Sequence, residues 1–274
     1  MNQSPHLSGQ TALVTGASAP RGIGRAIALR LAADGAMVVV TDIAGSFSDG
    51  ETQHDKFALL EGLVADITNA GGTARATTLD VTDKQAIDRV VSDIGRIDIL
   101  VSNAGSLAGA DKFLSTTPTQ WEQSFRVNLL GPMMLAQAVI PAMRTAGGGR
   151  IINIGSTGSL GGEPGFGAYT TMKHGLIGLT KTIAAEFGED GILCNAVCPG
   201  YINTDMHAAT NARLAQYNGQ SIEDMKQQRY AHVAVRRAGE PEEVAAAVAY
   251  LASPAAAYVT GITLPVSGGV PFGI

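Results

Sequence analysis

Tyr169 and Lys173 are spaced so that a helix would place both side chains on one face, with Cβ atoms about 5–6 Å apart. A phenol has an ordinary pKa of about 10, too high for a base near neutral pH. An ammonium about 4 Å away stabilises a phenolate by up to about 4 kcal/mol at an effective dielectric of about 20, which lowers the phenol pKa by about three units. Ser156, 13 positions before Tyr169, supplies a hydroxyl that could hydrogen-bond to a substrate oxygen. The three residues predict acid–base chemistry on an alcohol or a carbonyl.

A glycine cluster at residues 15–24 follows the first predicted strand and opens the first predicted helix. Glycines at such a position let the chain turn sharply and let main-chain N–H groups approach a pyrophosphate at the positive end of the helix. The cluster therefore predicts a dinucleotide-binding loop. Its predicted cofactor contacts are Gly16, Ser18, Arg21, Gly22, Ile23 and Gly24.

Asp42 ends the second predicted strand, where a carboxylate accepts hydrogen bonds from both adenosine ribose hydroxyls and repels a 2′-phosphate. Arg21 favours the opposite choice, because a guanidinium pairs well with a 2′-phosphate. The free energy needed to desolvate a carboxylate beside a phosphate exceeds the stabilisation that one exposed arginine gives to that phosphate. We therefore predict NAD as the cofactor.

Further cofactor contacts are predicted after the third and fourth strands. Asp80 could reach the adenine amino group, or could cap the next helix with Thr82 and Asp83. Small residues after the fourth strand would let the chain pass close to adenosine, while Asn103 ties neighbouring strands together. The predicted contacts in these two segments are Asp80, Val81, Asn103, Ala104 and Gly105.

Composition indicates a globular protein. The chain has 274 residues, of which 45% are hydrophobic and 16% charged, so material for a buried core is ample. The net charge of −5 and the lack of a long basic stretch argue against nucleic acid as a partner. No apolar run approaches the roughly 18 residues of a membrane span, and residues 1–10 lack a signal-peptide core, so we expect a cytoplasmic protein that does not enter a membrane. Cys194 and Cys198, on one predicted strand, would be too far apart for a disulfide.

Short β-branched segments alternate with longer helical patterns. Such strands, separated by helices, predict a doubly wound parallel sheet of the Rossmann type, with helices on both faces and a single domain over residues 1–274. The expected strands are Thr11–Thr15, Met37–Thr41, Ala74–Leu79, Ile97–Ser102, Ile151–Gly155, Leu193–Val197 and Thr263–Val266. The expected helices are Gly22–Asp34, Gln53–Ala70, Asp83–Ile94, Thr119–Thr145, Ala168–Phe187 and Pro241–Ala252.

Two segments are predicted to be irregular. Residues 200–239 form the longest stretch between strands, and a substrate lid is the expected use. Residues 42–53 are rich in Gly, Ser and Asp, which predicts a surface loop.

With these motifs in order, and with Pro199-Gly200 after them, the chain resembles the short-chain dehydrogenase/reductase family from about Leu7 to Gly269. The resemblance implies that Tyr169 is the general acid/base, that Lys173 lowers its pKa and holds the nicotinamide ribose, and that Ser156 polarises the substrate oxygen. Asn128 would support a water-linked proton relay. The resemblance also implies cofactor contacts from Tyr169, Lys173, Pro199, Gly200, Ile202 and Thr204.

One departure from the family concerns the glycine loop. Its usual pattern has three residues between the first two glycines, whereas Gly16 and Gly22 enclose five, so Ala19-Pro20 is an insertion.

Asn128 lies in a helical pattern four residues before Pro132. Because proline has no N–H, the main-chain carbonyl of Asn128 loses its helical partner and needs another donor. We predict a bend near Asn128 and an ordered water that bridges this carbonyl towards Lys173.

Substrate recognition is expected from the loop after Ser156 and from the lid. The expected substrate residues are Ser156, Leu160, Glu163, Phe166, Tyr201, Met206 and His207. The five histidines show no metal-ligand spacing, so no metal site is predicted. The family resemblance implies a homotetramer formed through residues 119–145 and 168–187.

The sequence thus predicts an NAD(H)-dependent oxidoreductase that interconverts a small secondary alcohol and a ketone. One alternative is a reductase of 3-oxoacyl thioesters on a carrier protein, which would need a basic patch; Arg126, Arg144 and Lys181 are the nearby candidates. An alternative of another class is a non-catalytic dinucleotide sensor. Such sensors tend to lose the tyrosine–lysine pair, which is intact here.

Overall fold

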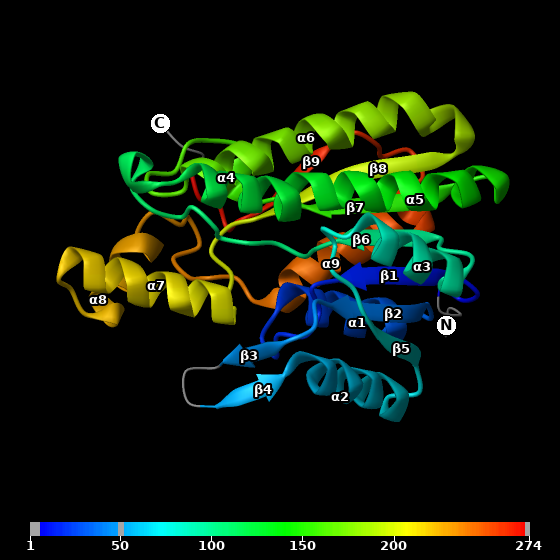
Figure 1. Ribbon diagram of the computed structural model, residues 1–274, viewed down its shortest axis with the longest axis horizontal. Coiled ribbons are helices and arrows are strands. Elements are labelled where there is room, and N and C mark those ends of the chain that lie inside the picture. The colour runs from blue at the N-terminus through cyan, green and yellow to red at the C-terminus, as the bar shows by residue number, and fades with distance from the viewer. Residues whose placement is uncertain (1–5, 49–51, 272–274) are drawn as a thin grey trace.

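A computed structural model describes residues 6–48 and 52–271. Its centre is a seven-stranded sheet in the order β5-β2-β1-β6-β7-β8-β9, and every neighbouring pair is parallel (Figure 1). The strands are β1 (Thr11–Thr15), β2 (Met37–Asp42), β5 (Thr73–Thr78), β6 (Ile99–Ser102), β7 (Gly149–Ile154), β8 (Ile192–Pro199) and β9 (Thr263–Val266). The predicted doubly wound parallel sheet is confirmed.

Helices cover both faces of the sheet (Figure 1). One core lies between the sheet and α1 (Ile23–Ala33), α2 (Lys56–Asn69) and α9 (Pro241–Ala252). The other lies between the sheet and α3 (Lys84–Ile94), α5 (Gly131–Thr145) and α6 (Gly167–Phe187). Alternate strand residues enter opposite cores: Val38 and Val40 face the first and Val39 the second. Both faces are buried, which is why these strands are almost continuously apolar.

The helix expected over residues 119–145 is interrupted. It consists of α4 (Pro118–Phe125), a π-helical turn (Arg126–Leu130) and α5. Within the turn the Gly131 N–H donates to the Arg126 carbonyl, five residues back. The irregularity lies where Pro132 was expected to disturb the helix near Asn128. The bridging water stays a prediction.

The expectation of a plain loop over residues 42–53 was wrong for its described part. Ser46–Ser48 (β3) pairs antiparallel with Gln53–Asp55 (β4), and residues 49–51 lie outside the described residues. Consequently α2 begins at Lys56, not at Gln53, with the Asp55 side chain accepting a hydrogen bond from the Ala58 N–H. Strand pairing in a separate two-stranded sheet is a tertiary feature that a polar, glycine-containing segment does not reveal.

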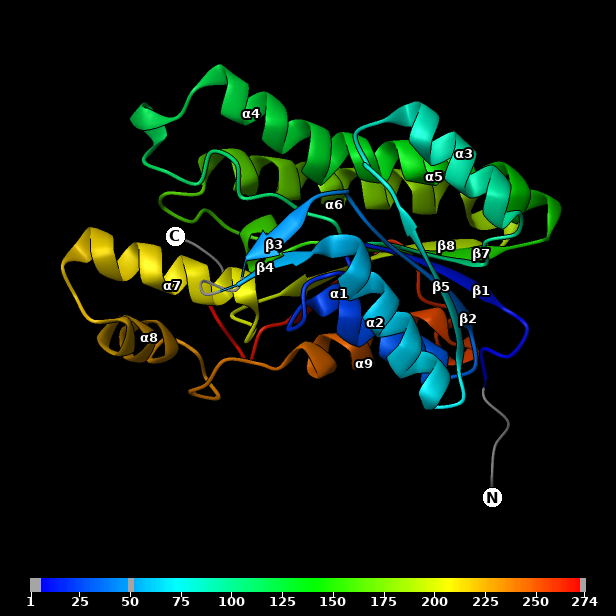
Figure 2. The same cartoon turned by 60° about the horizontal axis from the view of Figure 1, so that its bottom comes forward.

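The expectation that residues 200–239 are irregular was also wrong. The segment contains α7 (Asp205–Asn218) and α8 (Ile222–Tyr230), capped by the side chains of Thr204 and Ser221. Both helices are amphipathic only weakly, because they cover a cavity instead of the main core. Figure 2 shows them at the same end of the sheet as β3 and β4. The single-domain prediction for residues 1–274 includes residues 1–5, 49–51 and 272–274, which lie outside the described residues, and it stays a prediction.

Candidate active site

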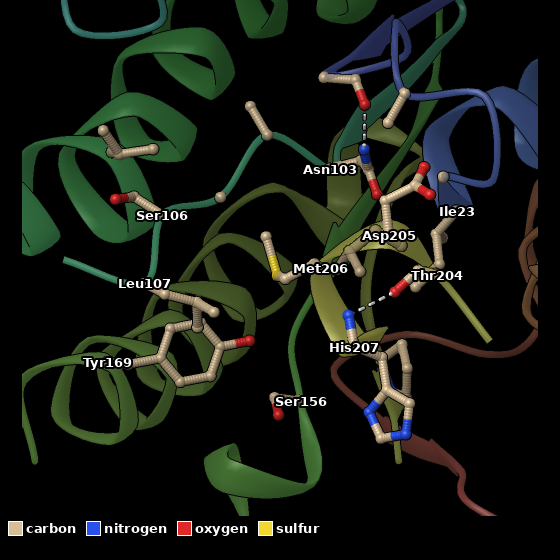
Figure 3. A pocket seen from close by; sticks show the side chains of 18 of the residues that line it. Ile23, Asn103, Ser106, Leu107, Ser156, Tyr169, Thr204, Asp205, Met206 and His207 are labelled. Atoms are coloured by element: carbon tan, nitrogen blue, oxygen red, sulfur yellow. Dashed lines mark hydrogen bonds between the residues drawn. The ribbon is translucent and has the colours of Figure 1, made fainter. Parts of the chain in front are cut away.

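A cavity of about 770 Å³ lies at the carboxyl ends of the central strands, under α7 and α8. It extends from Asp42, the last residue of β2, and Asp80, after β5, past Ser156 after β7, to Gly200 after β8 and Arg229 in the lid. Loops leave parallel strands at this edge, so distant segments meet there. The close-up in Figure 3 shows Tyr169, Ser156 and His207 around the same space.

The glycine loop forms one wall of the cavity. Gly16 has φ +69°, and a Cβ there would lie 2.8 Å from the Ala104 Cα. A Cβ on Gly24 would lie 2.5 Å from both the Gly16 carbonyl oxygen and Asn103 Nδ2. Gly22 is the N-cap of α1 and provides no capping side chain, and the first turn of α1 contains no acidic residue. Free N–H groups at an uncapped helix start fit a diphosphate, so the loop is suited to a dinucleotide.

Asp42 is fixed at the cavity wall by several hydrogen bonds. Its Oδ2 accepts from the Ser18 N–H at 3.2 Å and the Ser18 hydroxyl at 2.7 Å, and its Oδ1 lies 3.3 Å from Lys56 Nζ. A carboxylate held in this way fits a ribose diol. Lys56, which sequence reasoning missed, adds a cation at the same place.

Arg21 does not lie beside Asp42. Its Nε donates to Asp205 Oδ1 at 2.7 Å, and its main-chain N–H donates to Asp205 Oδ2 at 3.2 Å. The inserted pair Ala19-Pro20 thus carries Arg21 to the first residue of α7, where it ties the glycine loop to the lid. Because Arg21 is paired with Asp205, the structure gives no support to a role of Arg21 in binding the 2′-phosphate of NADP.

Most of the other predicted cofactor residues line the cavity. Asn103 also ties β6 to β1, since its Nδ2 donates to the carbonyls of Thr15 (2.8 Å) and Gly16 (2.9 Å). Asp80 Oδ1 accepts from the Thr82 N–H and hydroxyl, both at 2.8 Å, while Asp83 caps α3. The predicted cofactor residues on the wall, beyond those above, are Ile23, Val81, Ala104, Gly105, Pro199, Ile202 and Thr204.

Ser156 and Tyr169 come together although 13 residues separate them. Ser156 follows β7, and its hydroxyl accepts from the Gly158 N–H at 3.1 Å, which starts a short turn at Thr157–Ser159. Tyr169 lies in the first turn of α6 and lines the same cavity as Ser156, whose hydroxyl lowers the pKa of the phenol. The two hydroxyls are therefore placed to contact one substrate oxygen.

The electrostatics of Tyr169 differ from the sequence-based expectation. Burial raises the pKa of Tyr169 to about 12; the hydrogen bond from Ser156 lowers it, and the charge of Glu163 raises it. Lys173 is buried, donates to the Ile154 carbonyl at 2.7 Å, and has its own pKa lowered to about 8 by burial. Its Nζ lies 5.7 Å from the centre of the Tyr169 ring. The predicted fall in the Tyr169 pKa was wrong for this structure, because desolvation dominates and Lys173 is not among the groups that shift this pKa.

Asn128 is completely buried behind the cavity wall, in the π-helical turn. Its Oδ1 accepts from the Ser106 N–H at 3.1 Å, and its Nδ2 donates to the Ser106 carbonyl at 2.8 Å and the Ser124 hydroxyl at 3.2 Å. A Cβ on Gly105 would lie 3.3 Å from Asn128 Oδ1 and 3.9 Å from Lys173 Nζ. Asn128 thus holds the segment that passes between it and the lysine.

The substrate end of the cavity combines aromatic and charged groups. The rings of Tyr201 and His207 stack with centres 5.6 Å apart, and His207 Nε2 lies 3.0 Å from the Tyr230 hydroxyl. Burial, then the charges of Arg229 and Lys226, lower the pKa of His207 to about 4, so this imidazole is neutral. The predicted substrate residues on the wall are Ser156, Glu163, Phe166, Tyr201, Met206 and His207.

Three predicted site residues lie outside the wall besides Arg21: Leu160, Gly24 and Asn128. Leu160 ends the short turn after Ser156 and does not face the cavity. Sequence reasoning missed Lys56, Asp205 and Arg229, which do line it. No motif marks these three, although Asp205 directly follows Thr204, a helix-capping residue.

The described residues offer neither a metal site nor a membrane-spanning helix. Within residues 6–48 and 52–271, no group of three or more His, Cys, Asp or Glu side chains is placed to hold a metal ion. None of the helices in that part of the chain is long and apolar enough to span a membrane. Cys194 and Cys198 are both buried and free, as expected.

Comparisons with known proteins agree with this geometry. Residues 16–271 match the family model described as enoyl-(acyl carrier protein) reductase. The chain is 38% identical to 3-oxoacyl-[acyl-carrier-protein] reductase of Synechocystis sp., over 96% of this chain and 98% of the relative. It is 40% identical to the short-chain reductase protein NovJ of Streptomyces niveus, over 95% of this chain and 93% of the relative.

Solved structures give the same result. A short-chain dehydrogenase/reductase from Burkholderia xenovorans superposes with a TM-score of 0.87 at 31% identity, covering 97% of each chain. A variant of actinorhodin polyketide ketoreductase with NADPH superposes with a TM-score of 0.85 at 35% identity, covering 95% of this chain and 97% of that one. The chain therefore belongs to the short-chain dehydrogenase/reductase family.

Proposed function

We propose that this protein is an NAD(H)-dependent ketoreductase that interconverts 3-oxoacyl and 3-hydroxyacyl compounds. The observation that carries the proposal is the meeting of Ser156, Tyr169 and Lys173 in the same cavity as the glycine loop and Asp42. The names of the relatives support the 3-oxoacyl alternative better than a simple secondary alcohol, since several are 3-oxoacyl-[acyl-carrier-protein] reductases.

In the reducing direction, Tyr169 is the acid. Lys173 and Thr204 would hold the nicotinamide, which when bound would supply the hydride for the carbonyl carbon. Ser156 donates a hydrogen bond to the carbonyl oxygen, and the Tyr169 hydroxyl transfers its proton to that oxygen as the C=O π bond breaks. With a pKa of about 12, the Tyr169 hydroxyl is protonated at neutral pH and carries the proton that reduction requires.

The surface charges give less support to a substrate borne by a carrier protein. Of the candidate basic residues, Arg126 pairs with Glu122 at 3.0 Å and Arg144 with Asp190 at 2.9 Å. Lys181 alone would remain to face an acidic carrier. We therefore propose a small acyl compound rather than a carrier-bound one.

Turnover on a substrate panel tests the proposal. NADH oxidation is measured with 3-oxobutanoate, its methyl ester and its coenzyme A thioester, with a carrier-linked 3-oxoacyl thioester, and with simple ketones, for wild type and Tyr169→Phe. We expect the small 3-oxo compounds to be reduced best, and the variant to lose turnover by at least about 100-fold while NADH affinity stays near that of wild type. Equal turnover in the variant would remove Tyr169 from the mechanism. Tight NADH binding without reduction of any panel member would favour the sensor alternative.

We also propose a cytoplasmic homotetramer assembled through the helices at residues 119–145 and 168–187. These helices lie together on one face of the sheet (Figures 1 and 2), and a Cβ on Gly175 of α6 would lie 2.9 Å from Leu129 Cδ2. Their outer surface would be shared between subunits. Sedimentation equilibrium gives the mass, and a monomer at micromolar concentration would refute the assembly.

A further inference from the structure

The substrate end of the cavity holds a cation without a counter-ion. Arg229, in the last turn of α8, lines the wall. No carboxylate lies within ion-pair distance of its guanidinium in the part of the chain that the structure describes. At the cofactor end, by contrast, Asp42 pairs with Lys56 at 3.3 Å and Asp205 pairs with Arg21 at 2.6 Å. Arg229 is half-buried, and a substrate that removes its remaining water must pair with the guanidinium to offset the cost of desolvation.

Two contacts fix the Arg229 guanidinium. Its Nη1 donates to Oδ1 of Asn211, which is completely buried, and its carbon lies 4.2 Å from the centre of the Tyr201 ring. A guanidinium has five N–H donors, and only one of them is used within the described residues. The rest remain available for a planar acceptor that can take two parallel hydrogen bonds.

No charged group near Arg229 forms an ion pair with it in the described residues. Glu163 lines the same cavity and interacts with Arg229 electrostatically without forming an ion pair; burial raises the pKa of Glu163, and the charges of Arg229 and Arg213 lower it. His207 is neutral, as argued above. Arg213 is exposed and lies outside the wall, with its guanidinium carbon 5.2 Å from the centre of the Phe166 ring. Besides Lys173, which donates to the Ile154 carbonyl, Arg229 is therefore a cation on the cavity wall that is available to a substrate.

We propose that Arg229 binds a free carboxylate of the substrate, so that the enzyme acts on oxo acids rather than on neutral ketones, esters or thioesters. The inference rests on the proposed ketone reduction and narrows its substrate class. A carboxylate matches the geometry of a guanidinium, accepts two hydrogen bonds at once and supplies the missing counter-charge. Arg229 would then fix which carbonyl faces Ser156 and Tyr169, and would act as a specificity residue, not as a catalytic one.

The test uses matched pairs of acids and methyl esters. The probes are 3-oxobutanoate, 4-oxopentanoate and 5-oxohexanoate, each compared with its methyl ester and with the neutral N-acetylcysteamine thioester of 3-oxobutanoate. The series varies the distance from ketone to carboxylate, and each pair differs mainly in charge. For wild type we expect at least one acid to exceed its ester about 10- to 100-fold in kcat/KM, mostly through KM.

The variants are Arg229→Gln, Arg229→Lys and the control Lys226→Gln. Lys226 lies on the same helix outside the cavity wall and pairs with Glu223 at 3.9 Å, so the control removes an equal charge without touching the site. Arg229→Gln should abolish the acid preference, Arg229→Lys should restore part of it, and Lys226→Gln should keep it. The reduction of the esters and the thioester should change much less between wild type and Arg229→Gln than the reduction of the acids, and Lys226→Gln should leave all of these rates near those of wild type.

Two results would overturn the inference while leaving the proposed function intact: esters or the thioester used as well as every acid, or an unchanged acid-to-ester ratio in Arg229→Gln. Failure of wild type to reduce any probe would overturn the proposed function and this inference together.

Discussion

Cofactor choice in this protein depends on two opposite charges beside the expected ribose position. Asp42 is held by two hydrogen bonds from Ser18, and Lys56 Nζ lies 3.3 Å from its Oδ1. A 2′-phosphate brings a charge of about −1.5 to −2. At about 4 Å and an effective dielectric of about 20, a carboxylate repels each unit of this charge by about 4 kcal/mol. Lys56 lies beside Asp42 and offsets part of that repulsion.

The remaining difference should favour NAD over NADP by about 1.4–2.8 kcal/mol, a factor of about 10–100 in kcat/KM. Asp42→Asn keeps the side-chain shape and leaves Lys56 unpaired, so the ratio should reverse towards NADP. Lys56→Met removes the offset, so the preference for NAD should increase by at least about tenfold. The assay is kcat/KM for NADH and NADPH with one ketone at saturating concentration.

Asp88→Asn is the control, since it removes a carboxylate from a surface pair with Lys84 on α3, away from the cavity. The electrostatic reasoning fails if Asp42→Asn and Lys56→Met shift the cofactor ratio in the same direction, or if both stay within twofold of wild type.

Three further predictions follow from burial and packing. Because the Tyr169 pKa is about 12, alcohol oxidation, which needs the phenolate, should rise about tenfold per pH unit from pH 7 to 9 while reduction stays nearly flat; a plateau of oxidation below pH 8 would contradict this. Burial lowers the Lys173 pKa from 10.5 to about 8, so the folded protein binds fewer protons than the unfolded chain between these values and stability should rise with pH there. Lys173→Met removes a desolvation penalty of about 3 kcal/mol at pH 7 but leaves the Ile154 carbonyl without its donor, at a cost of about 1–3 kcal/mol. In urea unfolding the variant should therefore be as stable as wild type or more stable at pH 7, and less stable relative to wild type at pH 10, and it should show no turnover. A large loss of stability at pH 7 would refute the burial argument. Gly24→Ala should cost at least about 1–3 kcal/mol and weaken NADH binding, because its Cβ would overlap the Gly16 carbonyl, whereas Gly62→Ala in α2, whose Cβ meets no described atom within 4 Å, should be neutral or stabilising.

The sequence alone determined the order along the chain of the strands in the central sheet and of the helices that flank it, and it located the residues proposed to be catalytic. Periodicity located β1, β9 and α9 with their final bounds, and of these β1 and α9 bury most of their residues. Spacing was enough to bring Tyr169 and Lys173 together on α6, since four residues make about one helical turn. Pro132 was enough to locate the irregular turn near Asn128.

The tertiary structure decided what depends on long-range contacts and on burial. Lys56, Asp205 and Arg229 reach the cavity from segments whose local patterns carry no chemical motif, and Arg21 is paired with Asp205, 184 positions away. The direction of the Tyr169 pKa shift was also set by the fold, because spacing shows that a cation is near but not how much water both groups lose. Local sequence patterns specify which atoms neighbour one another along a helix; only the folded chain sets their solvent exposure and the charges that arrive from elsewhere.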